Sequence, residues 1–302
     1  MKIGIDLGGS HVSCGLVEKN ALRDCVDFDY KDEDKENLLD AIIDYIEEGI
    51  NYLLSNNDIS WDEVELIGIA SPGTISGDII VKAGNLGIEN FDIINRLKPL
   101  FPSGITYKIR NDGKCAALAE KQYGALKKYD DAIFINVGTG IGGAVFMNGN
   151  LLEPKRFSGF ELGHMIIQKD GIECTCGKKG CFERYCSIKA LKTRILKELD
   201  LDNIDCPGQK LREEIIPSHY YELKNIVNDY VDNMVIGLGN LIDIFEPEAI
   251  CFGGSFSYWE GTDIYKSIKR RLNKPGTTFN SEKPKIVAAK LRNNAGIVGA
   301  TL

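Results

Sequence analysis

Three glycine-rich turns, each directly after a run of apolar residues, constrain the fold of this chain more than any other feature. They read DLGGS at residues 6–10, GTGIGG at 138–143 and GGS at 253–255. Glycine lets backbone N–H groups approach phosphate oxygens because no Cβ stands in the way. A plain tight turn explains any one of them, but three in one chain favour a nucleotide-binding protein. No Walker loop is present and no Gly-x-Gly-x-x-Gly opens a helix, which argues against P-loop and dinucleotide-binding folds.

The order strand, glycine turn, strand occurs twice. Residues 2–6 and 12–17 flank the first turn, and residues 132–137 and 142–147 flank the second. This weak internal duplication predicts two α/β lobes, and a length of 302 residues suits about two domains. The other expected elements are strands at 23–28, 64–70, 106–110 and 249–252 and helices at 36–54, 112–123, 221–245 and 295–301, with residues 159–187 irregular.

Composition excludes several classes of protein. With 36 basic and 44 acidic residues the formal charge is −8, which argues against a nucleic-acid partner. No apolar run reaches the roughly 18 residues that a membrane span needs, and the start MKIGIDLGG reads as a strand rather than a signal peptide. We therefore expect a cytoplasmic protein without a membrane partner, in which the nine cysteines are thiols or metal ligands rather than disulfides.

A cluster of cysteines gives the most specific chemical signal. Cys174, Cys176 and Cys181 fall within one stretch of eight residues, on a glycine-rich loop. His164 lies ten residues before Cys174. Three thiolates and one imidazole make an ordinary tetrahedral zinc set, and four protein ligands mark a structural site. A redox pair is less favoured because one residue, not two, separates Cys174 from Cys176. The remaining alternative is a set of unrelated buried thiols.

Acidic residues stand beside these motifs. Asp6, just ahead of the first turn, can hold a hydrated Mg²⁺. Asp112 follows Asn111 where a strand becomes a helix, so it is either an ordinary helix-start residue or a general base facing a phosphate site. Glu161 and Glu183 flank the cysteine loop. With an imidazole they can bond several sugar hydroxyls, although solvated surface charges are the simpler interpretation of each alone.

These motifs together resemble the ROK family (repressors, open reading frames and kinases) over essentially the whole chain. The combination of ELGH and the cysteine loop is very specific, whereas the glycine turns alone are not. The matching pieces occur in family order: DLGGS at 6–10, SPG at 71–73, ND at 111–112, VGTGIGG at 137–143, ELGH at 161–164, CTCGKKGCFE at 174–183, FGGS at 252–255 and AGIVGA at 295–300.

The resemblance implies an α/β fold of two ribonuclease-H-like lobes of the actin-like ATPase type around a central cleft. The N-terminal lobe would span residues 1–111, with the last helix, 293–302, returning to it. The C-terminal lobe would span 112–292 and include the zinc loop at 159–187. Family members are commonly dimers or tetramers, so we expect a homo-oligomer, with a dimer favoured.

The resemblance also implies a role for each motif. The residue matching the family's catalytic base is Asp112. The residues that would bind sugar are Gly73, Asn85, Asn111, Asp112, Glu161, His164 and Glu183. Those that would hold ATP with Mg²⁺ are Asp6, Gly8, Gly9, Ser10, Gly138, Thr139, Gly140, Gly253 and Gly254, and the zinc ligands would be His164, Cys174, Cys176 and Cys181. His164 would thus touch both metal and sugar, and Asn85 resembles the asparagine of a glucokinase-type sugar loop.

Three positions depart from the family pattern. Ser10 replaces the usual Thr and keeps the hydroxyl, whereas His11 replaces a common Lys and weakens a charge near the phosphates. Phe160, directly before Glu161, stands where the family usually has a small residue. A bulky ring at that position can reshape the sugar pocket, so it leaves the sugar identity open.

The implied function is an ATP-dependent hexose kinase, with glucose phosphorylated to glucose 6-phosphate as the leading reaction. The alternatives are a kinase for N-acetylmannosamine, N-acetylglucosamine, fructose, allose or a glucoside, and a non-catalytic sugar sensor. A sugar-sensing repressor of the family carries a helix-turn-helix domain ahead of the first strand. Because the first strand begins at residue 2 here, we expect no such domain. Intact Asp6, Asp112 and glycine turns argue against a catalytically inactive protein.

Overall fold

The computed structural model describes residues 1–30, 33–34, 37–84, 86–153, 160–201 and 206–302. The chain forms two compact units. Met1–Gly124 and Asn293–Leu302 belong to the first unit, and Ala125–Leu152 and Phe160–Arg292 belong to the second. No helix among the described residues is long and apolar enough to span a membrane.

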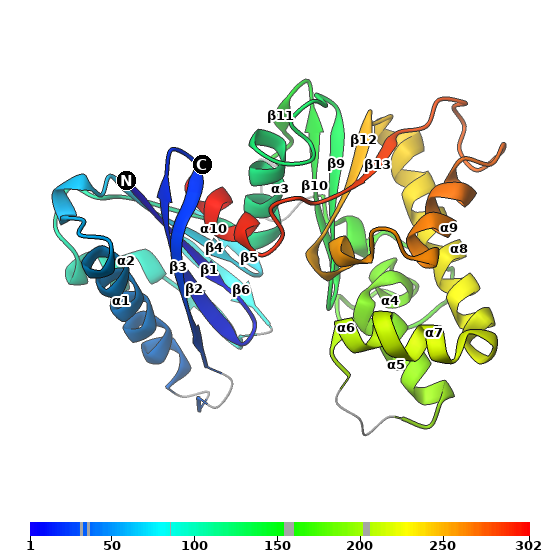
Figure 1. Cartoon of the computed structure of the whole chain (residues 1–302), viewed down its shortest axis with the longest axis horizontal. Coiled ribbons are helices and arrows are strands. Elements are labelled where there is room, and N and C mark those ends of the chain that lie inside the picture. The colour runs from blue at the N-terminus through cyan, green and yellow to red at the C-terminus, as the bar shows by residue number, and fades with distance from the viewer. Residues whose placement is uncertain (31–32, 35–36, 85, 154–159, 202–205) are drawn as a thin grey trace. The chain divides into compact units, whose positions relative to one another are not determined.

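The first unit is built on a five-stranded sheet with the order β3-β2-β1-β4-β8, of which Figure 1 labels β1, β2, β3 and β4. Strand β2 is antiparallel to both β1 and β3, while β4 is parallel to β1 and β8. Side chains alternate along β1, so Ile3 and Ile5 join the core beneath α1, whereas Gly4 faces the other side. The bounds are β1 Lys2–Leu7, β2 His11–Glu18, β3 Ala21–Asp29, α1 Leu38–Asn56, β4 Leu66–Ser71 and β8 Thr106–Asn111.

A row of glycines on that other side receives the last helix, α10 (Asn294–Ala300). Gly15, Gly4 and Gly68 lie in register across β2, β1 and β4. A Cβ atom on Gly4 would lie 2.1 Å from the Ile297 carbonyl oxygen, and one on Gly68 would lie 2.0 Å from that of Ala300. The helix backbone therefore lies directly against the sheet, which only glycine permits.

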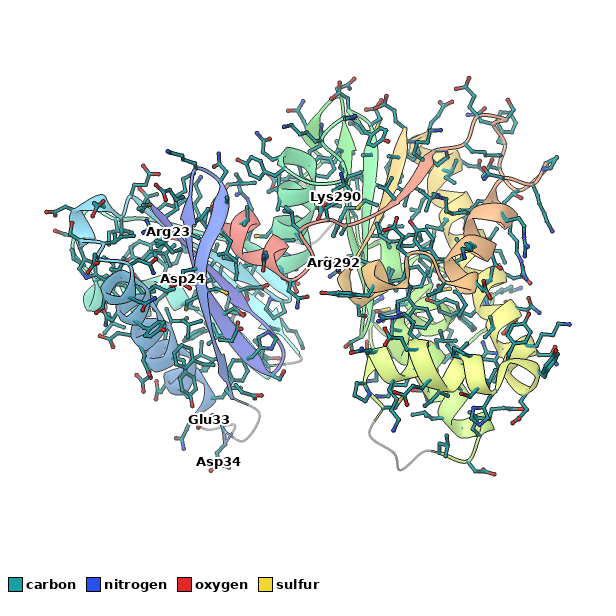
Figure 2. The ribbon with its side chains drawn as sticks, viewed as in Figure 1. Arg23, Asp24, Glu33, Asp34, Lys290 and Arg292 are labelled. Carbon is teal, nitrogen blue, oxygen red and sulfur yellow. The ribbon has the colours of Figure 1, made fainter. Side chains whose placement is uncertain are left out.

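Cations complete the attachment of α10 at its C-terminal end. The Lys2 Nζ donates to the Thr301 carbonyl at 3.1 Å, and the Lys108 Nζ donates to the Leu302 carbonyl at 3.0 Å. Positive charge at a helix C-terminus is stabilising because the last carbonyls carry partial negative charge. At the opposite edge of the sheet, Asp24 of β3, labelled in Figure 2, accepts from Asn56 and Asn57 and so links that edge to the end of α1.

The second unit repeats the strand order of the first, β11-β10-β9-β12-β13. Strand β10 is antiparallel to β9, and β12 is parallel to β9 and β13. This agrees with the predicted duplication. The bounds are β9 Ala132–Val137, β10 Ile141–Met147, β11 Asn150–Leu151, β12 Ala249–Gly253 and β13 Lys285–Ala288, and the main helices are α5 Ile188–Glu198, α8 Tyr220–Phe245 and α9 Asp263–Leu272.

Short elements fill the connections. A three-stranded sheet of β5 (Thr74–Ser76), β6 (Ile79–Ala83) and β7 (Ile88–Phe91) follows β4 and was not predicted. The segment at 159–187, expected to be irregular, contains a 3₁₀ turn and a short helix. The remaining elements are α2 Ile93–Leu97, α3 Asp112–Gln122, α4 Glu183–Cys186, α6 Gly208–Lys210 and α7 Ile216–Ser218, the 3₁₀ turns Trp61–Glu63, Lys98–Leu100, Leu162–His164 and Gly254–Trp259, and a π turn at Leu211–Ile215.

The division of the chain differs from the expected lobe boundary at one element. Helix α3 lies in the first unit, which continues to Gly124. The boundary expected from the sequence puts the start of the second lobe at residue 112. The reason is packing against α10, because a Cβ on Gly299 would lie 1.8 Å from the Cys115 carbonyl oxygen. The segment from β13 to α10, where Lys290 and Arg292 are labelled in Figure 2, leads back to the first unit.

Candidate active site

The predicted residues of the first unit gather where its parallel strands end. Strands β1, β4 and β8 run in the same direction, so their C-terminal ends meet at one edge of the sheet, the usual ligand edge of an α/β sheet. Asp6 lies near the end of β1, followed by Gly8, Gly9 and Ser10. The Gly8 N–H donates to the His11 carbonyl at 2.8 Å, which closes this first turn tightly.

Asn111 organises the next part of this edge. Its Nδ2 donates to the Gly73 carbonyl at 3.0 Å, and its Oδ1 accepts from the Lys114 N–H at 3.3 Å, which caps helix α3. Gly73 has a φ of 86°, and a Cβ there would lie 2.0 Å from the Lys82 carbonyl oxygen, so no other residue fits. Asp112 is thereby fixed as the first residue of α3, where its Oδ1 accepts from the Gly113 N–H at 2.7 Å.

The two carboxylates at this edge both have raised pKa values. Burial raises the pKa of Asp6 to about 7, and the negative charges of Asp112 and Asp27 add to the rise. Burial also raises the pKa of Asp112, although backbone N–H donors oppose the shift. Among the residues that the structure describes, no lysine or arginine forms an ion pair with either carboxylate. A hard divalent cation such as Mg²⁺ fits this arrangement because it would supply the missing positive charge.

In the second unit, two glycine turns lie side by side because β9 and β12 are neighbouring parallel strands. The Gly138 N–H donates to the Gly140 carbonyl at 2.9 Å, and the Ser255 Oγ donates to the Val137 carbonyl at 3.3 Å. A Cβ on Gly254 would lie 2.4 Å from the Asn136 Oδ1. The turns at 138–140 and 253–255 thus lie next to each other, with Thr139 exposed.

The four predicted zinc ligands come together in the second unit. The ligand atoms of His164, Cys174, Cys176 and Cys181 all lie within 4.8 Å of one another. The His164 Nδ1 is 3.6 Å from the Cys174 Sγ, and the Cys176 Sγ is 3.6 Å from the Cys181 Sγ. Around a tetrahedral zinc with bonds of about 2.0–2.3 Å, neighbouring ligand atoms are about 3.5–3.8 Å apart. The donor set and its spacing therefore fit a closed zinc site.

Glu183 connects this cluster to the glycine turns. Its Oε1 lies 3.1 Å from the Cys174 Sγ and 3.6 Å from the His164 Nδ1. Its Oε2 would lie 2.9 Å from a Cβ on Gly140. Because His164 turns its Nδ1 to the cluster, its Nε2 is left for another partner. A metal on Nδ1 would fix the tautomer in which Nε2 carries the proton and can donate.

Glu161 lies in the same turn as His164. It directly precedes the 3₁₀ turn Leu162–His164, and the His164 N–H donates to its carbonyl at 3.0 Å. Its side chain is exposed. Among the described residues, no group pairs with its carboxylate. The structure thus brings Glu161, His164 and Glu183 into one neighbourhood, while Asn85 lies outside the described residues.

A cavity of about 370 Å³ lies within the second unit, beyond the third glycine turn. It is walled by α7, the first half of α8 and the start of α9, and it contains the Trp259 and Thr262 that follow that turn. Arginine and lysine residues, among them Arg212 and Lys224, also line it. The sequence analysis did not identify these residues, because they come from separate segments and form no contiguous motif.

Comparison with known proteins gives consistent results. The chain matches a family model described as the ROK family over residues 2–302. A glucokinase of Thermotoga maritima is 28% identical over 317 residues, covering 99% of this chain and 95% of the relative. A xylose repressor of Caldicellulosiruptor bescii is 26% identical over 314 residues, covering 98% of this chain and 76% of the relative.

Solved structures show the fold. A ROK hexokinase from Thermus thermophilus superposes with a TM-score of 0.79 at 25% identity, covering 99% of this chain and 96% of that one. A ROK family glucokinase from Streptomyces griseus, solved with glucose and AMPPNP, gives a TM-score of 0.73 at 24% identity, covering 99% of this chain and 97% of that one. The predicted actin-like ATPase fold is confirmed.

Proposed function

The chain belongs to the ROK family, and from that premise we propose that it is a sugar kinase that transfers the γ-phosphate of ATP to a hexose hydroxyl. The observation that carries the proposal is the pair of carboxylates on Asp6 and Asp112. They are partly buried beside a glycine turn, and no cation among the described residues neutralises them. Retaining two such charges is costly for folding and useful for phosphoryl transfer.

Asp112 is proposed as the general base. The carboxylate is held at the start of α3 by the Asn111 cap, and burial raises its pKa toward that of a competent base. It would accept the proton of the sugar hydroxyl as the hydroxyl oxygen attacks the γ-phosphorus and the bond to the β-phosphate oxygen breaks. Asp6 would hold Mg²⁺ through its hydration shell, and the ion would supply positive charge to the phosphates.

The glycine turns are proposed to hold ATP. Backbone N–H groups at 8–10, 138–140 and 253–254 suit phosphate oxygens, because these turns have little side-chain bulk. The 3₁₀ turn Gly254–Trp259 leads from the third glycine turn to Trp259, which lines a cavity of the second unit. We therefore place the base in the cavity that contains Trp259, a residue only 1% exposed.

The sugar is proposed to bind to Glu161, His164 and Glu183 in the second unit and to Gly73, Asn111 and Asp112 in the first. In this arrangement His164 has two partners. Its Nδ1 would ligate zinc with Cys174, Cys176 and Cys181, and its Nε2–H would donate to a sugar hydroxyl. The zinc would be structural, because all four of its positions are filled by protein.

Glucose is proposed as the preferred sugar, with transfer to its 6-hydroxyl. Two glucokinase relatives, from Thermotoga maritima and Halalkalibacterium halodurans, at 28% and 27% identity, support this choice. A β-glucoside kinase of Listeria innocua at 27% identity keeps a glucoside as an alternative substrate. The test is a coupled assay of ADP release with glucose, mannose, fructose, N-acetylglucosamine, N-acetylmannosamine and a β-glucoside. Clear preference for any sugar other than glucose contradicts the assignment of glucose but not of kinase activity.

A sugar-sensing role is the second candidate, and the xylose repressor relative is the observation that favours it. Such a protein would bind sugar without turning it over. The same assay separates the two functions when it is paired with calorimetry, because a sensor would show sugar binding without ADP release above the rate without sugar.

A further inference from the structure

Phe160 has a backbone conformation that its side chain disfavours. Its φ is 59°, in the left-handed region, directly before Glu161. A residue with a Cβ usually avoids this region, whereas glycine adopts it freely. A strained residue persists only where surrounding structure over-determines it, and such residues gather at functional sites. We therefore expect another interaction to compensate for the backbone strain at Phe160.

The ring supplies that interaction. It packs against the core of the second unit and lies 6.5 Å from the ring of Phe245, at an interplanar angle of 55°. Phe245 is the last residue of α8, the longest helix of the described chain. An aromatic pair at this separation is favourable. Because the ring packs in the core, it does not contact a bound sugar. It can affect the following turn only by fixing the backbone of Phe160.

The turn is fixed on its other side as well. Leu162 is 6% exposed and joins the same core, and its N–H donates to the Phe160 carbonyl at 2.9 Å. A Cβ on Gly163 would lie 2.0 Å from the Ile141 carbonyl oxygen, so the turn lies directly on β10. Glu161 therefore stands between two anchored residues, with its own side chain exposed.

We propose that Phe160 is a positioning residue for sugar binding: its ring, packed on Phe245, holds the turn that presents Glu161 and His164. The inference rests on the proposed function, in which these two side chains contact the sugar. A preorganised turn binds more tightly because less conformational freedom is lost on binding. The bulky residue at this position thus acts by fixing the geometry of the sugar site.

The test uses Phe160→Ala and Phe160→Gly as a matched pair. Both remove the ring, but only Gly also removes the backbone strain. We expect sugar Kd, measured by calorimetry without ATP, to rise about 10-fold in both, with KM for the sugar rising in parallel. KM for ATP and the zinc content should stay within about twofold of wild type. Phe160→Gly should be more stable to urea than Phe160→Ala.

Partner and control variants make the test specific. Phe245→Ala should weaken sugar binding by a similar factor, and the double variant with Phe160→Ala should be no worse than either single one, because both remove one interaction. Phe160→Leu keeps an apolar side chain in the core and should stay within about threefold of wild type. Phe279→Ala, at a ring that is 92% exposed, should change nothing.

The inference is overturned if Phe160→Ala and Phe160→Gly lower stability while sugar Kd stays at the wild-type value, because the ring would then serve the core alone. Phe160→Gly and Phe160→Leu keep the test open if the Ala variant fails to fold. Failure of the proposed kinase function gives a different result. Wild-type protein would then bind sugar without turnover, and the change in sugar Kd would still report on Phe160.

Discussion

The five-stranded sheets of the two units have the same strand order. In each, a glycine turn follows the strand that comes first in the chain, β1 in the first unit and β9 in the second. Asp6 and Asn136 occupy equivalent places, since each is the last residue but one of that strand. The fifth strand of the first sheet leads into Asp112, whereas that of the second ends at Ala288. The strand before the glycine turn therefore carries an aspartate in the first unit and an asparagine in the second, where a carboxylate comes instead from Glu183 of α4, beside Gly140.

This difference assigns distinct chemistry to the two copies. Backbone N–H groups in glycine turns suit phosphate oxygens in either unit. Only in the first unit does the strand before the turn itself add negative charge, which suits a cation and a general base and would repel a phosphate without that cation. The neutral amide of Asn136 adds no such repulsion, although the Glu183 carboxylate lies beside Gly140. Sequence inspection of the first turn alone could not reveal this, because the meaning of Asn136 depends on its equivalence with Asp6.

The helix-packing faces differ in the same way. Gly4, in the middle of β1, lets α10 lie on the first sheet. The equivalent place in β9 is Phe134, which is 1% exposed and whose ring lies against Gly253 of β12. The first unit therefore holds its last helix through backbone proximity, while the second relies on side-chain packing.

The strongest test of the comparison is removal of the proposed base. Asp112→Asn keeps the shape of the side chain and loses its basicity, so kcat should fall by about 10²–10⁴-fold. Sugar affinity should change little, because the amide still forms hydrogen bonds. Steady-state kinetics and calorimetry measure both. Asp78→Asn, an exposed site between β5 and β6, is the control, and near-normal turnover in Asp112→Asn would refute the assignment.

The next largest effect is expected in stability. The pKa of Asp6 is about 7 in the folded state and near 3.8 when unfolded, so the folded state holds the proton more tightly and stability falls as pH rises from about 4 to 7. Asp6→Asn should remove that fall and raise the unfolding free energy at pH 8, without Mg²⁺, by about 2–4 kcal/mol. Urea unfolding from pH 4 to 8 measures this. If the unfolding free energies of wild type and Asp6→Asn change with pH in the same way, the ionised Asp6 carboxylate does not destabilise the fold, and the prediction is wrong.

The metal cluster gives a third test, restricted to the second unit. Cys176→Ser should lose zinc, because a hydroxyl is a poor ligand, and activity should fall by at least about 10-fold as His164 and Glu183 lose their frame. Metal analysis and the coupled assay measure these changes. Cys25→Ser, at an exposed thiol of the first unit, should keep both metal and activity. A fully active, zinc-free Cys176→Ser protein would disprove the zinc site.

The smallest effect tests the difference between Asp6 and Asn136. Asn136→Asp would give the second sheet the acidic residue of the first, placing negative charge beside the turns at 138–140 and 253–255. One unfavourable charge interaction of about 1 kcal/mol corresponds to a rise of about fivefold in KM for ATP. Asn136→Ala removes the amide without adding charge and should change KM for ATP less. If both variants have the same KM for ATP, charge at this position does not affect ATP binding, and the proposed contrast between Asp6 and Asn136 is contradicted.

Sequence patterns predicted the elements whose own residues determine them. Apolar runs before glycine turns identified β1 and β9, and the long apolar stripe identified α8, which begins one residue earlier than expected, at Tyr220. The sheet at β5, β6 and β7 escaped prediction because strands of three to five residues depend on pairing rather than on their own pattern. The last helix begins at Asn294 and ends at Ala300.

The candidate site divides in the same way. The zinc ligands lie close together in the chain, so their spacing alone predicted the cluster that the structure assembles. The Phe160–Phe245 contact and the cavity beyond Trp259 join segments far apart in the sequence. Such features depend on tertiary packing, and no local sequence motif predicts them.

The most direct measurement of the central claim is phosphoryl transfer to sugar by the purified protein. With Mg²⁺ and ATP, we expect stoichiometric ADP and sugar phosphate, fastest with glucose and with the phosphate on the 6-hydroxyl, and loss of this activity in Asp112→Asn. Tight sugar binding without ADP release for any sugar of the panel, in protein that retains its zinc, would contradict it.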